Sequence, residues 1–333
     1  MLSLAAEETT KFADIDVAAW QWGVFLGLVV VLLLADLLVL HRKPHAIPFK
    51  EAAIESAVWI AIGLGFGFLV LHWFGSSAAG EYWSGYLIEQ SLSIDNVFVW
   101  AVILSFFVVP SKYQFRVLFW GIFGALVLRA LFIFAGVALI EAFSFVLYIF
   151  GAFLLYTAWK IAFHDETEVD PENNLALRLL RKVIPSTTDY DGQKLFTRGP
   201  DGKRLATPLF AVLIMVETTD VVFAVDSIPA ILAVARDQYI VFSSNAFAIL
   251  GLRSLYFLLS GMAERFRYLN MGLGVILAFV GVKMLLTDVY HFPTPVALGV
   301  IIGTLAVSVL FSLRAERRDS RNTVDELLDA EDE

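Results

Sequence analysis

The sequence predicts an all-α membrane protein, a bundle of about nine transmembrane helices with an inverted 3+3 repeat. Three observations support this prediction. Hydrophobic residues make up 59% of the chain and charged residues only 17%, and apolar stretches of about 20 residues, each long enough to cross a bilayer as a helix, recur along it. Basic residues gather on one side of the predicted spans. Charged residues also recur inside the spans at near-equal spacing in two halves of the chain.

Nine apolar segments form the predicted spans: 17–40, 52–74, 83–109, 115–139, 143–162, 208–234, 240–261, 270–290 and 295–313. The prediction thus divides the chain into an outer tail, a first membrane half, a long loop, a second membrane half and an acidic tail. These parts cover residues 1–16, 17–162, 163–207, 208–313 and 314–333.

The basic residues predict the orientation. If the N-terminus lies outside, most of the 24 Lys and Arg residues fall on the inner side, and only Lys11 and Arg236 lie outside. Because inner loops of membrane proteins carry an excess of Lys and Arg, we expect the N-terminus outside and the C-terminus in the cytoplasm.

The loop 163–207 is the one long connection, and it lies on the predicted inner side. Its stretch "PENNLALRLLRKVIP" predicts a short surface helix. The following "TTDYDGQKLFTRGPDGKRLATP" contains two Asp-Gly pairs, which favour tight turns, and predicts a small β-hairpin.

Several function classes are disfavoured by composition. The net charge of −9 comes largely from the two tails, which argues against nucleic-acid binding. The chain has no cysteine, so neither disulfides nor thiolate metal ligands are available. The start of the chain lacks the basic region of a cleavable signal peptide, and we expect the first apolar segment to stay as a helix. No catalytic motif is placed to work, so we expect neither an enzyme nor a bound cofactor.

The charges inside the spans predict an inverted repeat. Aligning "SIDNVFV" with "TTDVVFA" pairs Asp95 with Asp220, and nearly the same offset pairs Arg129 with Arg253 and then Lys160 with Lys283. The separations are 34 and 31 residues in the first copy and 33 and 30 in the second. Spans three to five run opposite to spans six to eight. Many carriers have this architecture, with substrate sites near the midplane between the two copies.

Acids outnumber bases within the predicted spans. Six of these acids are taken as candidate site residues, Asp36, Glu89, Asp95, Glu217, Asp220 and Asp226, against the four bases of the repeat. This surplus of negative charge suits a divalent cation. In the alternative interpretation, the charges form structural ion pairs and some acids are protonated, with Lys160 and Lys283 extending to the membrane surface.

Oxygen ligands predict a hard divalent cation such as Mn²⁺, Ca²⁺ or Mg²⁺. We expect the ligands to be Glu89, Asp95, Asn96, Glu217, Asp220 and Asp226. Supporting groups are expected from Asp36, Ser93, Thr219, Ser227, Asn245, Arg129, Arg253, Lys160 and Lys283. Asn245 can equally be a helix–helix hydrogen-bonding group, and Asp36 an interfacial salt bridge. Pro229 predicts a local break in the helix beside Asp226.

Four stretches carry a family resemblance: "ADLLVLHRKPHAI", "EQSLSIDNVFVW", "ATPLFAVLIMVETTDVVFAVDSIPAI" and "SSNAFAILGLRSLYF". Together they resemble the tellurium-resistance TerC family of integral membrane proteins, and the resemblance runs from about residue 20 to 313. It implies a bacterial inner-membrane protein of the larger group that includes LysE-type exporters. Family members are associated with Mn²⁺ efflux, with metal supply to exported proteins, and with tellurite or alkaline-stress phenotypes. The family's acidic positions match the six predicted ligands, together with Asp36.

Two functions remain open at this stage. The first is a carrier that exports Mn²⁺ or another hard cation, with proton exchange at the acids. The second is a membrane scaffold or assembly factor in which the charges only hold helices together, a role linked to a chloroplast branch of the resembled family. The expected partners are a divalent metal ion and the lipid bilayer. A homo-oligomer or a membrane-protein partner also stays open.

Overall fold

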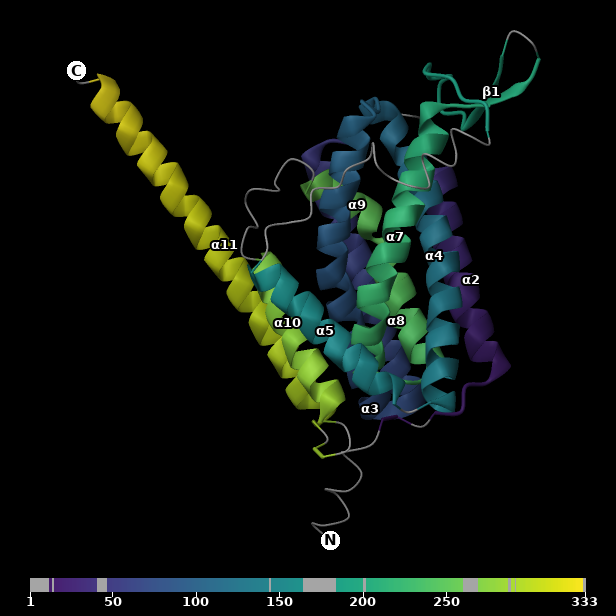
Figure 1. The fold of residues 1–333 in the computed structure, drawn as a ribbon, viewed down its shortest axis with the longest axis vertical. Helices are drawn as coiled ribbons and strands as arrows, with labels where there is room; N and C mark the ends of the chain where they lie inside the picture. The colour runs from purple at the N-terminus through teal and green to yellow at the C-terminus, as the bar shows by residue number, and fades with distance from the viewer. Residues whose placement is uncertain are drawn as a thin grey trace.

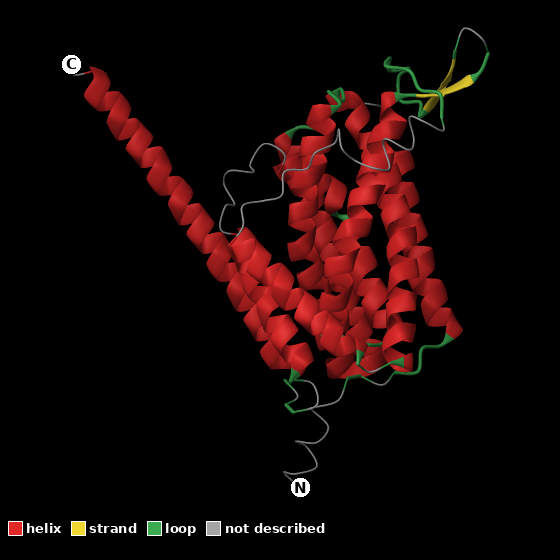
Figure 2. Cartoon of the chain, in the orientation of Figure 1, coloured by secondary structure: helices red, strands yellow, loops and turns green. Residues whose placement is uncertain are grey.

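A computed structural model describes residues 12–13, 15–40, 47–143, 145–163, 184–199, 202–259, 269–286, 289–290 and 292–331. Nearly all of them are helical (Figures 1 and 2). The elements in chain order are α2 (Ala19–Ala35), the π-helix η1 (Asp36–Leu40), α3 (Phe49–Phe106), α4 (Ser111–Ala142), α5 (Val146–Phe163), β1 (Phe196–Arg198), β2 (Arg204–Ala206), α7 (Pro208–Leu232), α8 (Gln238–Leu250), α9 (Leu252–Leu259), α10 (Leu269–Leu285) and α11 (Thr294–Glu331).

Six helical segments are long and apolar enough to cross a membrane: Ala19–Leu38, Phe49–Phe106, Ser111–Ala142, Pro208–Leu232, Gln238–Leu259 and Thr294–Ser312. Val146–Ile161 and Met271–Leu285 are shorter apolar helices. Large hydrophobic side chains such as Phe68 and Leu131 are more than 60% exposed on the outside of the bundle, as expected where lipid replaces water. The prediction of an all-α membrane protein is thus confirmed, whereas the number of nine spans stays a prediction.

Helix α3 reverses direction at Gly75. Its 58 residues would extend about 87 Å as one straight helix, far beyond a hydrocarbon core of about 30 Å. Gly75 has φ 85° and ψ −177°, a conformation that glycine adopts without a Cβ clash. The two arms then pack against each other: the Tyr82 hydroxyl donates to the carbonyl of Gly63 at 2.8 Å, and the Trp83 indole donates to Leu64 at 3.2 Å. One helical element therefore forms a hairpin.

The segment formed by α8 and α9 lies at the centre of the bundle. In its most apolar window 83% of the residues are buried, against 17–33% in the other five candidate spans. Helix α3 packs along both α8 and α9, and α4 packs along α7. A second group, formed by α5, α10 and α11, stands at one side, and α11 extends well beyond it (Figure 1).

The predicted break at Pro229 is wrong. The backbone of α7 stays helical through Pro229 and ends at Leu232, because a proline this close to the end of a helix removes only one backbone hydrogen bond. In the described part of the same half, α8 and α9 are separated by Gly251, whose φ of −79° and ψ of −11° stay close to helical values. That position is two residues before Arg253.

The predicted hairpin in the long loop is confirmed. Strands β1 and β2 pair antiparallel, with Phe196 opposite Ala206, and Gly202 in the connection has φ 74°. The short surface helix predicted at 171–185 falls almost entirely outside the described residues. The acidic end of the chain continues α11 as a helix to Glu331.

Candidate functional site

The Arg129 side chain is the centre of a buried charge cluster. It projects from the middle of α4 and is fully buried. Its Nη2 and Nε donate to the two carboxylate oxygens of Asp220 on α7, at 3.2 and 3.4 Å. Its Nη1 donates to Glu89 on α3 and, at 3.2 Å, to the Ser227 hydroxyl on α7. One guanidinium thus joins three helices and contacts two carboxylates.

Neutral polar groups complete the surroundings of Glu89. The Ser93 hydroxyl donates to one of its oxygens at 3.1 Å, and the Asn245 amide donates to the other at 3.0 Å. Glu89, Ser93 and Asn245 are all fully buried. Helix α8 therefore contributes to the cluster through Asn245, because its central place in the bundle brings it against α3.

Several buried polar atoms on α3, α7 and α8 have no hydrogen-bond partner among the described residues. They include Oδ1 of Asn245, Oε2 of Glu217, the hydroxyl of Ser91 and Nδ2 of Asn96. Three of these four atoms are oxygens. A buried polar atom without a partner costs about 1–3 kcal/mol, so a group of them indicates a place that receives a ligand or water.

Glu217 lies on the face of α7 that packs against α4. A Cβ on Gly124 would approach Oε1 of Glu217 to 1.9 Å, so the missing side chain of this glycine makes room for the carboxylate. The two threonines that follow, Thr218 and Thr219, bond back to their own helix, donating to the carbonyls of Ile214 and Val216. Thr219, predicted as a supporting group, is therefore engaged with the backbone.

A second buried ion pair joins the two halves of the chain. Arg253 on α9 donates from both terminal nitrogens to the two carboxylate oxygens of Asp36 in η1. Its guanidinium also lies 4.3 Å from the ring centroid of Phe115, within the range of a cation–π interaction. The alternative interpretation of Asp36 as a salt-bridge partner is supported, although the pair is buried rather than interfacial.

The remaining predicted site residues differ in their burial and in whether the structure describes their side chains. Lys160 is exposed on α5, whereas Lys283 on α10 is buried. The backbones of Asp95 and Asp226 lie in α3 and α7, but their side chains fall outside the described part of the structure. Among the described residues, no group of three or more His, Asp or Glu side chains is arranged to hold a metal ion. The six-residue ligand set therefore stays a prediction.

A further acidic residue, Glu81, was missed in the sequence. It is fully buried in α3, and its Oε1 accepts from the backbone nitrogen of Ala13 at 2.6 Å. Lys283 is within its electrostatic range, and both Lys283 and Arg236 lie against the ring of Phe12, at 5.7 and 4.4 Å from its centroid. Glu81 falls just before the predicted third span, so no in-membrane charge pattern could have found it.

Comparison with known proteins places the chain in a family. Residues 74–320 match the integral membrane protein TerC family. An uncharacterized membrane protein STKORF319 of Myxococcus xanthus is 47% identical over 91% of this chain and 95% of its own length. The "Putative membrane-bound redox modulator Alx" of Escherichia coli K12 is 46% identical over 87% of this chain and 93% of its own length. None of the solved structures matches. The match of the family over most of the chain, together with these two relatives, shows that this protein belongs to the TerC family of integral membrane proteins.

Proposed function

We propose that this protein transports a hard divalent metal cation across the bilayer, with Mn²⁺ as the first candidate. The observation that carries the proposal is the excess of buried oxygens around Arg129. Glu89 and Asp220 share this one guanidinium, and one oxygen each of Asn245, which binds Glu89, and of Glu217, three residues before Asp220 on α7, has no partner among the described residues. Carboxylate, amide and hydroxyl oxygens are the ligands that hard cations prefer.

In this proposal Arg129 serves as a tethered counter-charge. Without a metal ion, its guanidinium lies between Glu89 and Asp220 and offsets one of their two negative charges, which lowers their mutual repulsion in a medium of low dielectric constant. An entering divalent cation competes for the same carboxylates and displaces the guanidinium. Departure of the cation restores the ion pairs. This exchange gives both acids a cationic partner in either state, which lowers the cost of holding them inside a membrane.

The arrangement of nine spans, with spans three to five and six to eight related by an inverted repeat, belongs to the same proposal. Its support includes a symmetric contact between α5 and α10. Gly151 lies nine residues before Lys160, and Gly274 lies nine before Lys283. A Cβ on Gly151 would meet the carbonyl of Gly281 at 3.0 Å, and one on Gly274 would meet the carbonyl of Ala158 at 3.6 Å. Ala158 and Gly281 are each two residues before those lysines. The repeat therefore matches Gly151 with Gly274 and Ala158 with Gly281, and each of the two contacts is the equivalent of the other.

The proposed location is the inner membrane of a bacterium, with the N-terminus outside and the C-terminus in the cytoplasm. Support comes from the bias of Lys and Arg residues and from the bacterial origin of the relatives. The name of the Alx relatives describes a redox modulator. Because this chain has no cysteine, we propose that any such effect here follows from metal movement rather than from thiol exchange by the chain.

A flux measurement in proteoliposomes tests the proposal. The purified chain is compared for uptake of Mn²⁺, Ca²⁺, Mg²⁺ and Zn²⁺ across a pH gradient. Glu89→Gln and Asp220→Asn should abolish Mn²⁺ flux. The matched control is Glu141→Gln, which changes an exposed carboxylate at the end of α4 and should leave flux unchanged. Mn²⁺ flux that survives both buried substitutions in folded protein rejects the proposal.

A second candidate function is a membrane scaffold, for which the paired arginines are the motivating observation. Both Arg129 and Arg253 hold a carboxylate with two nitrogens, as structural locks would. A charge-neutral triple variant, Glu89→Gln with Arg129→Met and Asp220→Asn, separates the two functions. A scaffold should fold and keep its cellular phenotype with these charges removed together, because no charge is left unpaired. A carrier should fold and lose flux.

A further inference from the structure

The β-hairpin is anchored to one end of the helix bundle. The Tyr190 hydroxyl donates to the carbonyl of Phe107 at 2.6 Å, in the turn between α3 and α4. The ring of Phe196 lies 4.5 Å from that of Phe210 on α7, measured between centroids. Strand β2 ends only two residues before α7 begins. These contacts fix the hairpin beside the ends of α4 and α7, at the point where the apolar spans start.

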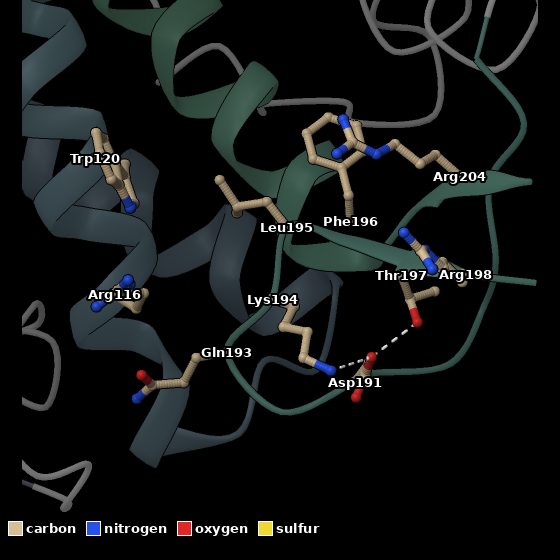
Figure 3. Close-up of a pocket in the computed structure, with 10 residues that line it drawn as sticks. All are labelled: Arg116, Trp120, Asp191, Gln193, Lys194, Leu195, Phe196, Thr197, Arg198 and Arg204. Carbon is tan, nitrogen blue, oxygen red and sulfur yellow. Dashed lines mark hydrogen bonds and ion pairs between the residues drawn. The ribbon is translucent and has the colours of Figure 1, made fainter.

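A cavity of about 900 Å³ opens between the hairpin and α4 (Figure 3). Helix α4 contributes Arg116 and Trp120, and the rest of the described lining comes from hairpin residues within 191–198 and from Arg204. Among the lining residues that the structure describes, four are basic, Arg116, Lys194, Arg198 and Arg204, and one is acidic, Asp191. These described side chains together carry a net charge of three positive units.

Three of these cations are available to a ligand. Asp191 accepts from Lys194 at 2.9 Å and from Thr197 at 2.7 Å, so this acid is already occupied. Arg116, Arg198 and Arg204 have no carboxylate partner within the part of the chain that the structure describes. Guanidinium groups recognise phosphate oxygens through paired hydrogen bonds, so an anionic phosphate group fits this charge.

The cavity also has an apolar side at the level of the membrane boundary. Trp120 is 38% exposed and Phe196 is 40% exposed, and Leu195 lies beside them in the lining (Figure 3). With 32 residues, α4 is about 48 Å long, so its ends reach past the hydrocarbon core into the headgroup region. Arg116 lies about 8 Å and Trp120 about 13 Å from the start of α4 at Ser111. Tryptophan at this depth is typical of the membrane interface.

We propose that this cavity binds the headgroup of an anionic phospholipid. The phosphodiester would be held by Arg116, Arg198 and Arg204, and the upper part of an acyl chain would lie along Trp120 and Phe196. The position favours a lipid over a soluble anion, because the basic and apolar sides meet where a phospholipid changes from headgroup to chain. Basic pockets at the ends of transmembrane helices bind anionic lipids in this way.

Lipid competition measured by native mass spectrometry tests the proposal. The full-length chain in detergent is incubated with equal amounts of phosphatidylglycerol and phosphatidylethanolamine. We expect preferential retention of phosphatidylglycerol. The preference should fall about fivefold for each arginine removed. Arg116→Ala should show this factor once, and the double variant Arg198→Ala with Arg204→Ala should show it for each of its two substitutions. Lys203→Ala is the matched control, because Lys203 is exposed on the same hairpin but does not line the cavity.

The variants must stay folded, which monodisperse size-exclusion profiles establish. Replacement of Arg198 and Arg204 by lysine keeps the charge but removes the paired geometry, and should retain an intermediate preference. Equal retention of the two lipids, or an equal loss in Lys203→Ala, overturns the proposal. Displacement of the lipid by millimolar inorganic phosphate would assign the cavity to a soluble anion instead. Displacement by an acidic peptide would assign it to a protein partner. Both outcomes contradict the lipid assignment.

Discussion

Arg129 and Asp220 are joined by two hydrogen bonds of 3.2 and 3.4 Å although they stand 91 residues apart in the chain. Both are fully buried, and the pair connects α4 of the first half to α7 of the second. Glu89 binds the same guanidinium from α3. The three charged side chains, each on a different helix, therefore depend on one another for their charge balance. The first prediction follows from this dependence.

Removal of Arg129 alone should destabilise the protein more than removal of the whole cluster. Arg129→Met leaves Glu89 and Asp220 buried without their cation, and an uncompensated buried charge costs about 3–5 kcal/mol. The triple variant that also carries Glu89→Gln and Asp220→Asn should recover most of that loss. Thermal unfolding in detergent measures both. An equally low midpoint in the triple variant would contradict the ion-pair account.

The pair of Arg253 with Asp36 predicts that lysine cannot replace the arginine. Arg253 binds both oxygens of Asp36 and lies over the ring of Phe115. A lysine offers one nitrogen and no planar group, so Arg253→Lys should lower the unfolding midpoint clearly. Asp36→Asn should do the same, whereas Asp16→Asn, at an exposed position, should have no effect. Equal midpoints for Asp36→Asn and Asp16→Asn would rule out a stabilising pair.

The close approach of α5 and α10 predicts a strong effect of one methyl group. A Cβ on Gly281 would meet the backbone carbonyl of Gly151 at 2.9 Å, and a backbone atom cannot move aside as a side chain can. Gly281→Ala should therefore destabilise the protein by about 1–3 kcal/mol. Gly303→Ala on α11 is the control, since no atom of the described residues lies within 4 Å of its added carbon. Thermal unfolding of the two variants distinguishes them, and equal stability would mean that the helices do not pack this closely.

Substitution of Gly124 is expected to change function with little change in stability, unlike the substitution of Gly281. Its added methyl group would overlap Oε1 of Glu217, the end of a flexible side chain that can rotate away. Under the proposed function, Gly124→Ala should fold normally and alter Mn²⁺ flux by displacing this carboxylate. Gly27→Ala, whose added carbon would meet no described atom within 4 Å, should alter neither. Unchanged flux in folded Gly124→Ala would remove Glu217 from the transport site.

Asp191 predicts a pH effect at the hairpin. Hydrogen bonds from Lys194 and Thr197 hold the pKa of this carboxyl below its ordinary value of 3.8. Because the pKa of Asp191 is lower in the folded than in the unfolded chain, these contacts stabilise the hairpin fully when the pH is above the unfolded-state pKa. The stabilisation is lost as the pH falls through the folded-state pKa. An NMR titration of the Asp191 carboxyl should give a midpoint below 3.8. In Thr197→Val the midpoint should rise, and an unchanged midpoint would mean that the threonine contact is absent.

Local signals in the sequence determined the membrane character, the hairpin and the presence of buried charges on identifiable helices. Apolar length, an Asp-Gly turn and a charge inside an apolar run each depend only on neighbouring residues. The pairing of the charges was decided by tertiary structure. That Arg129 meets both Glu89 and Asp220, that Arg253 meets Asp36, and that Glu81 is buried against Ala13 depend on how each helix is rotated against its neighbours. Rotation is set by packing over the whole bundle, and no single segment encodes it.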